Sequence, residues 1–217
     1  MIDKVKKKLL ELMEDGQSKG DKKIVIIDPE SLLPPSDERE PDMRTIGLFG
    51  DVAEEKVAEL IQALLYLNEL NKLQPEEEER KPIEFYVSTY GGNADDMFAL
   101  FDIMTIVKKE TDIQTIGLGK VMSAGVLILA AGTEGQRRIG KNCRVMIHNV
   151  IGGSMGSLPN LANELGAIEQ LQEDYIRALV ESTKMTRKQL RKMLNEKVNV
   201  YLDAEEAVKL GIADIIV

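Results

Sequence analysis

The chain has 217 residues, of which 43% are hydrophobic, enough for the core of a single globular domain. With 37 acidic against 28 basic residues, its net charge of −9 argues against binding a nucleic-acid backbone. The charged N-terminus is unlike a signal peptide, and the longest apolar run, 121–131, is too short to cross a bilayer. Because the single cysteine, Cys143, cannot form an internal disulfide, a soluble cytoplasmic protein is predicted.

The first 44 residues differ in pattern from the rest of the chain. An amphipathic stretch ends at Gly16, a short apolar strand follows at 24–27, and the segment 29–42 is rich in proline and charge. We therefore expect a divergent N-terminal segment, 1–44, made of a helix, a short strand and a linker. The main domain is expected over 45–217.

The main domain has a regular alternation of short apolar runs and longer amphipathic ones. Strands are predicted at 45–50, 83–89, 111–119, 144–148 and 213–217, and helices at 52–70, 95–109, 124–132, 157–183, 186–196 and 204–210. The acidic run 75–82 and the glycine-rich run 149–157 are predicted loops, and the segment 197–203 is left without an assignment. Strands alternating with helices predict an α/β fold with largely parallel pairing.

His148 is the only histidine, so any mechanism with an imidazole base must use it. It ends a predicted strand just before the glycine-rich run, where a side chain can face a cleft. The other interpretation is a structural histidine whose ring is satisfied at the end of a strand.

Ser123 lies between a predicted strand and an apolar helix and has two interpretations. It can cap the helix, or it can be a nucleophile held where the following amides and the helix dipole favour developing negative charge. The stretch is not the G-x-S-x-G turn of α/β-hydrolases, because Val121 stands two residues before the serine. The residues alone leave both roles open.

Two other features are weaker. The pair Gly91-Gly92 is either a simple turn or a place where a backbone N–H faces an oxyanion. Cys143 is a rival nucleophile, but it precedes His148 by five residues on one strand, so their side chains should point to opposite faces. No metal-ligand spacing and no phosphate-binding loop is present, and we expect no cofactor, no metal and no ATP site.

Together these motifs resemble the proteolytic subunit of the Clp protease, the ClpP family, from about Thr45 to the C-terminus. The resemblance is carried by GLFGDV, EFYVSTYGG, GKVMSAG, RVMIHNVIGGSMG and YLDAEEAVKLGIAD. It implies a ClpP/crotonase-like stack of β-β-α units with a protruding handle helix after Gly156, through which two rings meet. It also implies a strand from the glycine-rich run beside that helix.

The resemblance also implies site roles. Ser123 would be the nucleophile, His148 the general base, and Gly92 and Ala124 the sources of oxyanion-hole amides. Asn199 stands where the family has the triad aspartate; its carbonyl can accept the histidine Nδ1–H but supplies no charge, so lower activity is expected. Val198 replaces an arginine that takes part in contacts between rings in the family.

The function implied is that of a serine endopeptidase that hydrolyses peptides and unfolded proteins inside an oligomeric chamber. Its rings would be heptameric, and its partner would be an AAA+ unfoldase, although the family's pore-lining segment is not recognisable in 1–44. The alternative is a weakly active or inactive structural or regulatory subunit that co-assembles with an active paralogue. A specialised processing peptidase would use the same residues. An acyl-CoA enzyme of the crotonase type is disfavoured, because it would leave the serine and histidine without a purpose.

Overall fold

The structure is a computed structural model that describes residues 43–75, 80–196 and 199–217. The predictions made for the N-terminal segment fall outside the described residues, apart from its last two positions. Val198 and residues 76–79 of the acidic loop also fall outside them.

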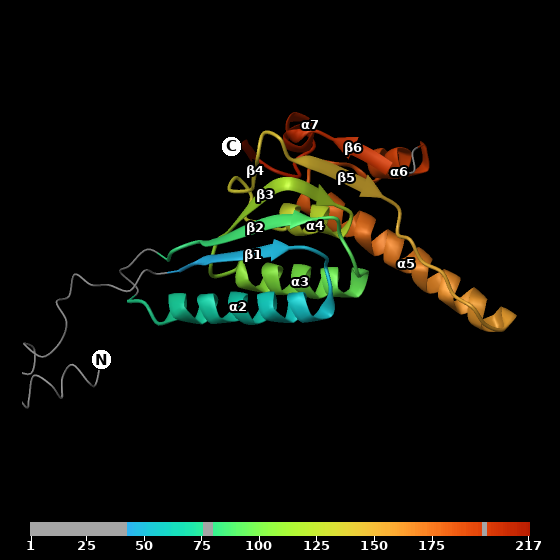
Figure 1. Cartoon of the computed structure of the whole chain (residues 1–217), viewed down its shortest axis with the longest axis horizontal. Helices are drawn as coiled ribbons and strands as arrows, with labels where there is room; N and C mark the ends of the chain where they lie inside the picture. Colours follow the sequence, from blue (N-terminus) through green and yellow to red (C-terminus); the bar gives the residue numbers. More distant parts are fainter. Residues whose placement is uncertain (1–42, 76–79, 197–198) are drawn as a thin grey trace, which may run out of the picture. The chain divides into compact units, whose positions relative to one another are not determined.

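The described residues form seven strands and six helices (Figure 1). The strands are β1 (Thr45–Phe49), β2 (Ile83–Thr89), β3 (Ile113–Met122), β4 (Arg138–Ile139), β5 (Arg144–His148), β6 (Asn199–Leu202) and β7 (Ile215–Ile216). The helices are α2 (Glu54–Lys72), α3 (Ala94–Val107), α4 (Ala124–Ala130), α5 (Leu158–Ser182), α6 (Arg187–Glu196) and α7 (Ala204–Lys209).

The strands make one sheet in which all pairs but one are parallel. β1, β2 and β3 are neighbours in that order; β3 then pairs first with β4, which pairs with β7, and further along with β5. Only β5 and β6 are antiparallel among the described strands. The predicted α/β class with largely parallel pairing is therefore confirmed. The carboxyl ends of β2, β3 and β5 come together at one edge, which is where ligands bind in open α/β sheets.

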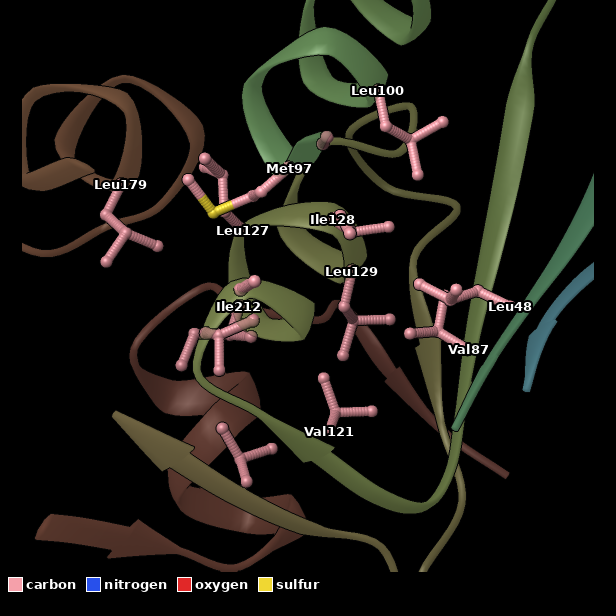
Figure 2. Packing of buried hydrophobic residues seen from close by; sticks show 14 of the residues in the cluster. Leu48, Val87, Met97, Leu100, Val121, Leu127, Ile128, Leu129, Leu179 and Ile212 are labelled. Carbon is pink, nitrogen blue, oxygen red and sulfur yellow. The ribbon is translucent and has the colours of Figure 1, made fainter. Parts of the chain in front are cut away.

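The core is built around α4, whose seven residues are all buried. Figure 2 shows Leu127, Ile128 and Leu129 of this helix between side chains of the sheet, such as Val121, and of the neighbouring helices. A helix that is apolar all round must be buried on every side. The start of α4, directly after β3, is thus held firmly against the rest of the domain.

Helix α5 begins away from the domain and runs back into it, and Figure 1 shows its first half extending beyond the other elements. Apolar side chains on this half and on the preceding loop are exposed: Ile151, Met155, Leu158, Leu161 and Leu165, which we call the handle patch. In contrast, Tyr175, Ile176, Ala178 and Leu179 in the second half are buried. The expected protruding handle is present.

The glycine-rich run forms the loop predicted from the sequence, and the strand implied by the resemblance, which needs a peptide or a second copy to pair with, stays a prediction. Residues 149–157 are irregular. They lie along α5, where a Cβ built on Gly152 would approach Ile168 Cδ1 to 2.6 Å. An extended segment needs a partner strand for its backbone groups, and the described residues offer none at this place.

Other differences from the predicted elements are small. β4 was not predicted, because two residues between turns carry no periodic signal. β3 continues to Met122 rather than ending at Gly119, and the unassigned segment contributes β6. Both strands are completed by pairing with β5.

Candidate active site

One cavity of about 770 Å³ contains four of the predicted site residues. Ser123 and Ala124 reach it from the β3–α4 junction, Gly92 from the turn after β2, and His148 from the end of β5. Its apolar wall includes Met97, Phe98, Ile168, Leu171 and Tyr175. The structure therefore brings together residues that are 31 and 25 positions apart in the sequence, Gly92 with Ser123 and Ser123 with His148.

Ser123 has an unusual backbone, with φ 53° and ψ −122°, and is the one non-glycine residue with positive φ among those described. Such a conformation costs about 1–3 kcal/mol and persists only where the surroundings enforce it. Ser123 N–H donates to Met146 O at 2.8 Å, and its carbonyl accepts from Val126 N–H at 3.0 Å and from the Tyr175 hydroxyl at 3.1 Å. The turn is thus held from β5, α4 and α5.

Ser123 stands at the N-cap position of α4, but its side chain makes no capping hydrogen bond. The structure does not support the interpretation of this serine as a side-chain cap. The hydroxyl is therefore available in the cavity rather than occupied by the helix.

The turn after β2 is shaped by two glycines. Gly91 has φ 105°, and a Cβ there would lie 2.6 Å from Ser123 Cβ, so any side chain would push into the serine. Gly92 pairs with Val52 through its neighbours: Val52 N–H donates to Gly91 O, and Asn93 N–H donates to Val52 O, both at 2.8 Å. This bridge does not use the Gly92 N–H, which stays available for another acceptor.

The imidazole of His148 has a defined contact on one side. Its Nδ1 lies 2.5 Å from the backbone carbonyl oxygen of Asn149. Because a carbonyl only accepts, a hydrogen bond at this contact is donated by Nδ1–H, and in that neutral tautomer Nε2 holds the lone pair. The Asn149 side chain donates to Leu194 O at 3.1 Å, which ties this part of the chain to α6.

Asn199 lies directly opposite His148 in the antiparallel pair of β5 and β6. Both residues line a second cavity of about 370 Å³, whereas Asn199 does not line the cavity that contains Ser123. Within the described residues, no hydrogen bond joins Asn199 to His148, and none joins His148 to Ser123 Oγ. The acceptor role expected of Asn199 stays a prediction.

Cys143 lies outside both cavities and is buried just before β5. Burial raises the pKa of its thiol to about 11, so the reactive thiolate is scarce at neutral pH. Among the residues that the structure describes, no group of three or more His, Cys, Asp or Glu side chains is arranged to hold a metal ion.

Two residues near the site were not found by sequence reasoning. Tyr175 donates to the carbonyl of Ser123, and Gln172 Oε1 accepts from Val150 N–H at 2.6 Å. They are three residues apart on α5 and so lie on the same face of the helix. Their spacing was visible in the sequence, but nothing there indicated that this face meets the active site.

The fold and this cavity define an α/β protein of the class in which a serine at a strained turn and a histidine share one cleft. The chain belongs to the Clp protease family: the family model described as Clp protease matches residues 38–217. A curated relative, ATP-dependent Clp protease proteolytic subunit 1 of Prochlorococcus marinus, is 30% identical over 174 residues, which cover 80% of this chain and 83% of the relative. The resemblance inferred from the motifs is confirmed. In the part of the chain that is described, no helix is both long and apolar enough to span a bilayer.

Proposed function

We propose that the chain is a serine endopeptidase of the ClpP type that hydrolyses peptides and unfolded proteins. Ser123 is the nucleophile, His148 the general base, and the amides of Gly92 and Ala124 form the oxyanion hole. Asn199 stands beside His148 in place of a charged third residue. The observation that carries the proposal is the uncapped hydroxyl of Ser123, held at a strained turn in the same cavity as the only histidine.

In the proposed reaction, Ser123 Oγ attacks the carbonyl carbon of the scissile peptide while its proton passes to Nε2 of His148. The oxyanion accepts hydrogen bonds from the two amides. The C–N bond then breaks, and the imidazolium gives its proton to the leaving amine, which leaves an acyl-enzyme. A water molecule, deprotonated by His148, hydrolyses the ester and restores the serine.

The handle patch supports assembly into rings. Its exposed apolar side chains, from Ile151 to Leu165, belong to the first half of α5 and the loop before it. Figure 1 shows that this half of the helix protrudes, and exposed apolar patches mark contacts between proteins. We propose a chamber built from heptameric rings in the cytoplasm, with an AAA+ unfoldase as the partner that supplies unfolded chains. An extended peptide or a second copy of the glycine-rich run would give residues 149–157 the strand partner that the single chain lacks.

A second candidate function is a weakly active or inactive subunit that co-assembles with an active paralogue. It is favoured by the uncharged Asn199 beside His148 and by the missing hydrogen bond between His148 and Ser123 among the described residues. A serine that is not deprotonated would still fit a structural role in a mixed ring.

The proposal is tested with a fluorophosphonate probe and a fluorogenic peptide. The assembled wild type should be labelled and should cleave the peptide, whereas Ser123→Ala should do neither. Ser157→Ala is the matched control, because Ser157 is exposed at the start of α5 and makes no capping bond; its labelling should equal that of the wild type.

Native mass spectrometry of each preparation establishes that rings are present before activity is judged. If the assembled wild type is neither labelled nor active, the enzyme assignment fails and the structural subunit takes its place. Labelling that persists in Ser123→Ala would assign the nucleophile to another residue.

A further inference from the structure

A single peptide group connects the imidazole of His148 to the side chain of Gln172 on helix α5. His148 Nδ1 contacts the carbonyl oxygen of Asn149, and the N–H of the same peptide group, that of Val150, donates to Gln172 Oε1 at 2.6 Å. In a trans peptide the C=O and N–H bonds point in opposite directions. Fixing the Val150 N–H on α5 therefore aims the Asn149 carbonyl at the imidazole.

The side-chain amide of Gln172 has one hydrogen-bonding group that is not satisfied, and the contact with the Val150 N–H explains why. Its Nε2 is buried and has no hydrogen-bond partner in the described part of the chain. The amide cannot turn round to relieve this, because the Val150 N–H needs an acceptor and only Oε1 provides one. A buried donor without a partner is destabilising, so such a group calls for a functional reason.

The hydrogen bond from Val150 to Gln172 also changes the acceptor strength of the carbonyl. Donors and acceptors linked through one peptide group polarise one another, by about 10–30% for each bond. The Asn149 oxygen thus becomes a better acceptor for the Nδ1–H. This effect supplies part of what a charged third residue would give, at a site where the sequence has the neutral Asn199.

We propose that Gln172 is a positioning residue for His148: through the peptide group between Asn149 and Val150, it holds the proton on Nδ1 and leaves Nε2 free as the base. The inference deepens the proposed peptidase function and rests on it for its catalytic meaning. The helix face that carries Gln172 also carries Tyr175, which holds the Ser123 turn. Helix α5 therefore holds both the Ser123 turn and the loop that follows His148.

The only histidine makes the proton position directly measurable, independently of catalysis. We would label the full chain with ¹⁵N-histidine and record the solid-state ¹⁵N spectrum of the assembled protein at a pH where the ring is neutral. The wild type is expected to show the Nδ1–H tautomer. A wild-type spectrum with the Nε2–H tautomer would overturn the proposal whether or not the protein cleaves peptides.

Three variants separate positioning from packing. Gln172→Leu removes the acceptor and should shift the tautomer population toward Nε2–H. Its kcat should fall by up to about tenfold, with KM within about twofold of the wild-type value, because part of the general-base contribution is lost. Gln172→Glu keeps an acceptor oxygen and should retain the wild-type tautomer. Gln170→Leu is the matched control on the same helix; its exposed side chain donates to Asp174 Oδ1, and neither tautomer nor kcat should change.

Two further results decide the remaining cases. If Gln172→Leu assembles and keeps both the Nδ1–H tautomer and the wild-type kcat, Gln172 is only a loop anchor and the proposal fails. If that variant does not assemble, Asn199→Ala decides: an unchanged tautomer supports the carbonyl of Asn149 as the acceptor, and a shifted one assigns the acceptor to Asn199. If the protein has no peptidase activity, the tautomer measurements still test the positioning role of Gln172. Failure of the proposed function can therefore be told apart from failure of this inference.

Discussion

Replacing Asn199 by aspartate adds a negative charge directly opposite His148. Residues directly opposite in an antiparallel pair have Cβ atoms about 4.5–5.5 Å apart, so the new carboxylate should lie about 4–5 Å from the imidazole. Two unit charges at 4 Å interact by about 1 kcal/mol in water and about 4 kcal/mol at an effective dielectric of 20. Because Asn199 is exposed, the lower part of that range applies.

We therefore expect Asn199→Asp to stabilise the imidazolium that forms in the transition state by about 1–2 kcal/mol. This corresponds to a gain in kcat/KM of roughly 5- to 30-fold. The gain should shrink in high salt, since an exposed pair of charges is screened. The assay is hydrolysis of a fluorogenic peptide by ring preparations of equal concentration at two ionic strengths.

Asn195→Asp is the matched control for this experiment. Asn195 lines the same cavity of about 370 Å³ as Asn199, but it lies on α6 and is not paired with His148. Its activity should stay within about twofold of the wild type. An assembled Asn199→Asp protein with no gain would refute the reasoning and favour the structural subunit, whereas equal gains in both variants would show a general charge effect.

Three further outcomes follow from the contacts in the structure. Tyr175→Phe removes the hydroxyl that holds the Ser123 carbonyl and should lower kcat by about fivefold at unchanged KM, measured by peptide kinetics; an unchanged kcat would exclude this role. Since burial raises the pKa of Cys143 to about 11, iodoacetamide at pH 8 should modify this thiol only after unfolding, and rapid alkylation of the native protein, seen by mass spectrometry, would contradict the buried position. Asp214→Asn leaves the buried Arg137 guanidinium without its carboxylate and should cost about 3–5 kcal/mol of unfolding free energy at pH 7 in urea titrations. Burial acts to raise the pKa of Asp214, but the hydrogen bonds and charge of Arg137 outweigh it and lower the pKa. The stabilisation from this pair is therefore complete above about pH 4 and is lost as the pH falls through the folded pKa. A difference in unfolding free energy between wild type and Asp214→Asn that does not shrink in acid would contradict this.

Sequence patterns predicted the larger elements well because those elements have one clear periodicity. β5 begins and ends where the apolar run 144–148 does, and the long amphipathic helix was placed within one residue of α5 at each end. β4 was missed because its two residues are strand only through their partners on β3 and β7. The pairing that creates it is a tertiary effect, which local sequence does not encode.

The candidate site was predictable where its residues form local motifs and unpredictable where helix α5 crosses it. The serine turn, the glycine pair and the histidine strand each carry a local signal, and the parallel sheet brings their ends to one edge. Gln172 and Tyr175 belong to an amphipathic pattern that predicts only a buried face. Which groups that face touches depends on how α5 packs against the β3–α4 junction and the loop after β5.

The uncharged carbonyl of Asn149 and a carboxylate at position 199 would have different effects on the imidazole of His148. A carbonyl that accepts the Nδ1–H fixes the tautomer but contributes little to balancing the imidazolium, whereas a carboxylate does both. If the two act on one nitrogen, their effects cannot be independent, since Nδ1 carries a single proton. The loss caused by Gln172→Leu should therefore be smaller when Asn199→Asp is also present, because the introduced carboxylate can accept the Nδ1–H hydrogen bond that the misdirected carbonyl no longer accepts. A double-mutant cycle on kcat measures this directly: a coupling of about 0.5 kcal/mol or more is expected for groups that share a partner. Strictly additive effects on kcat would mean that the orientation set by α5 and the charge introduced on β6 act on His148 independently.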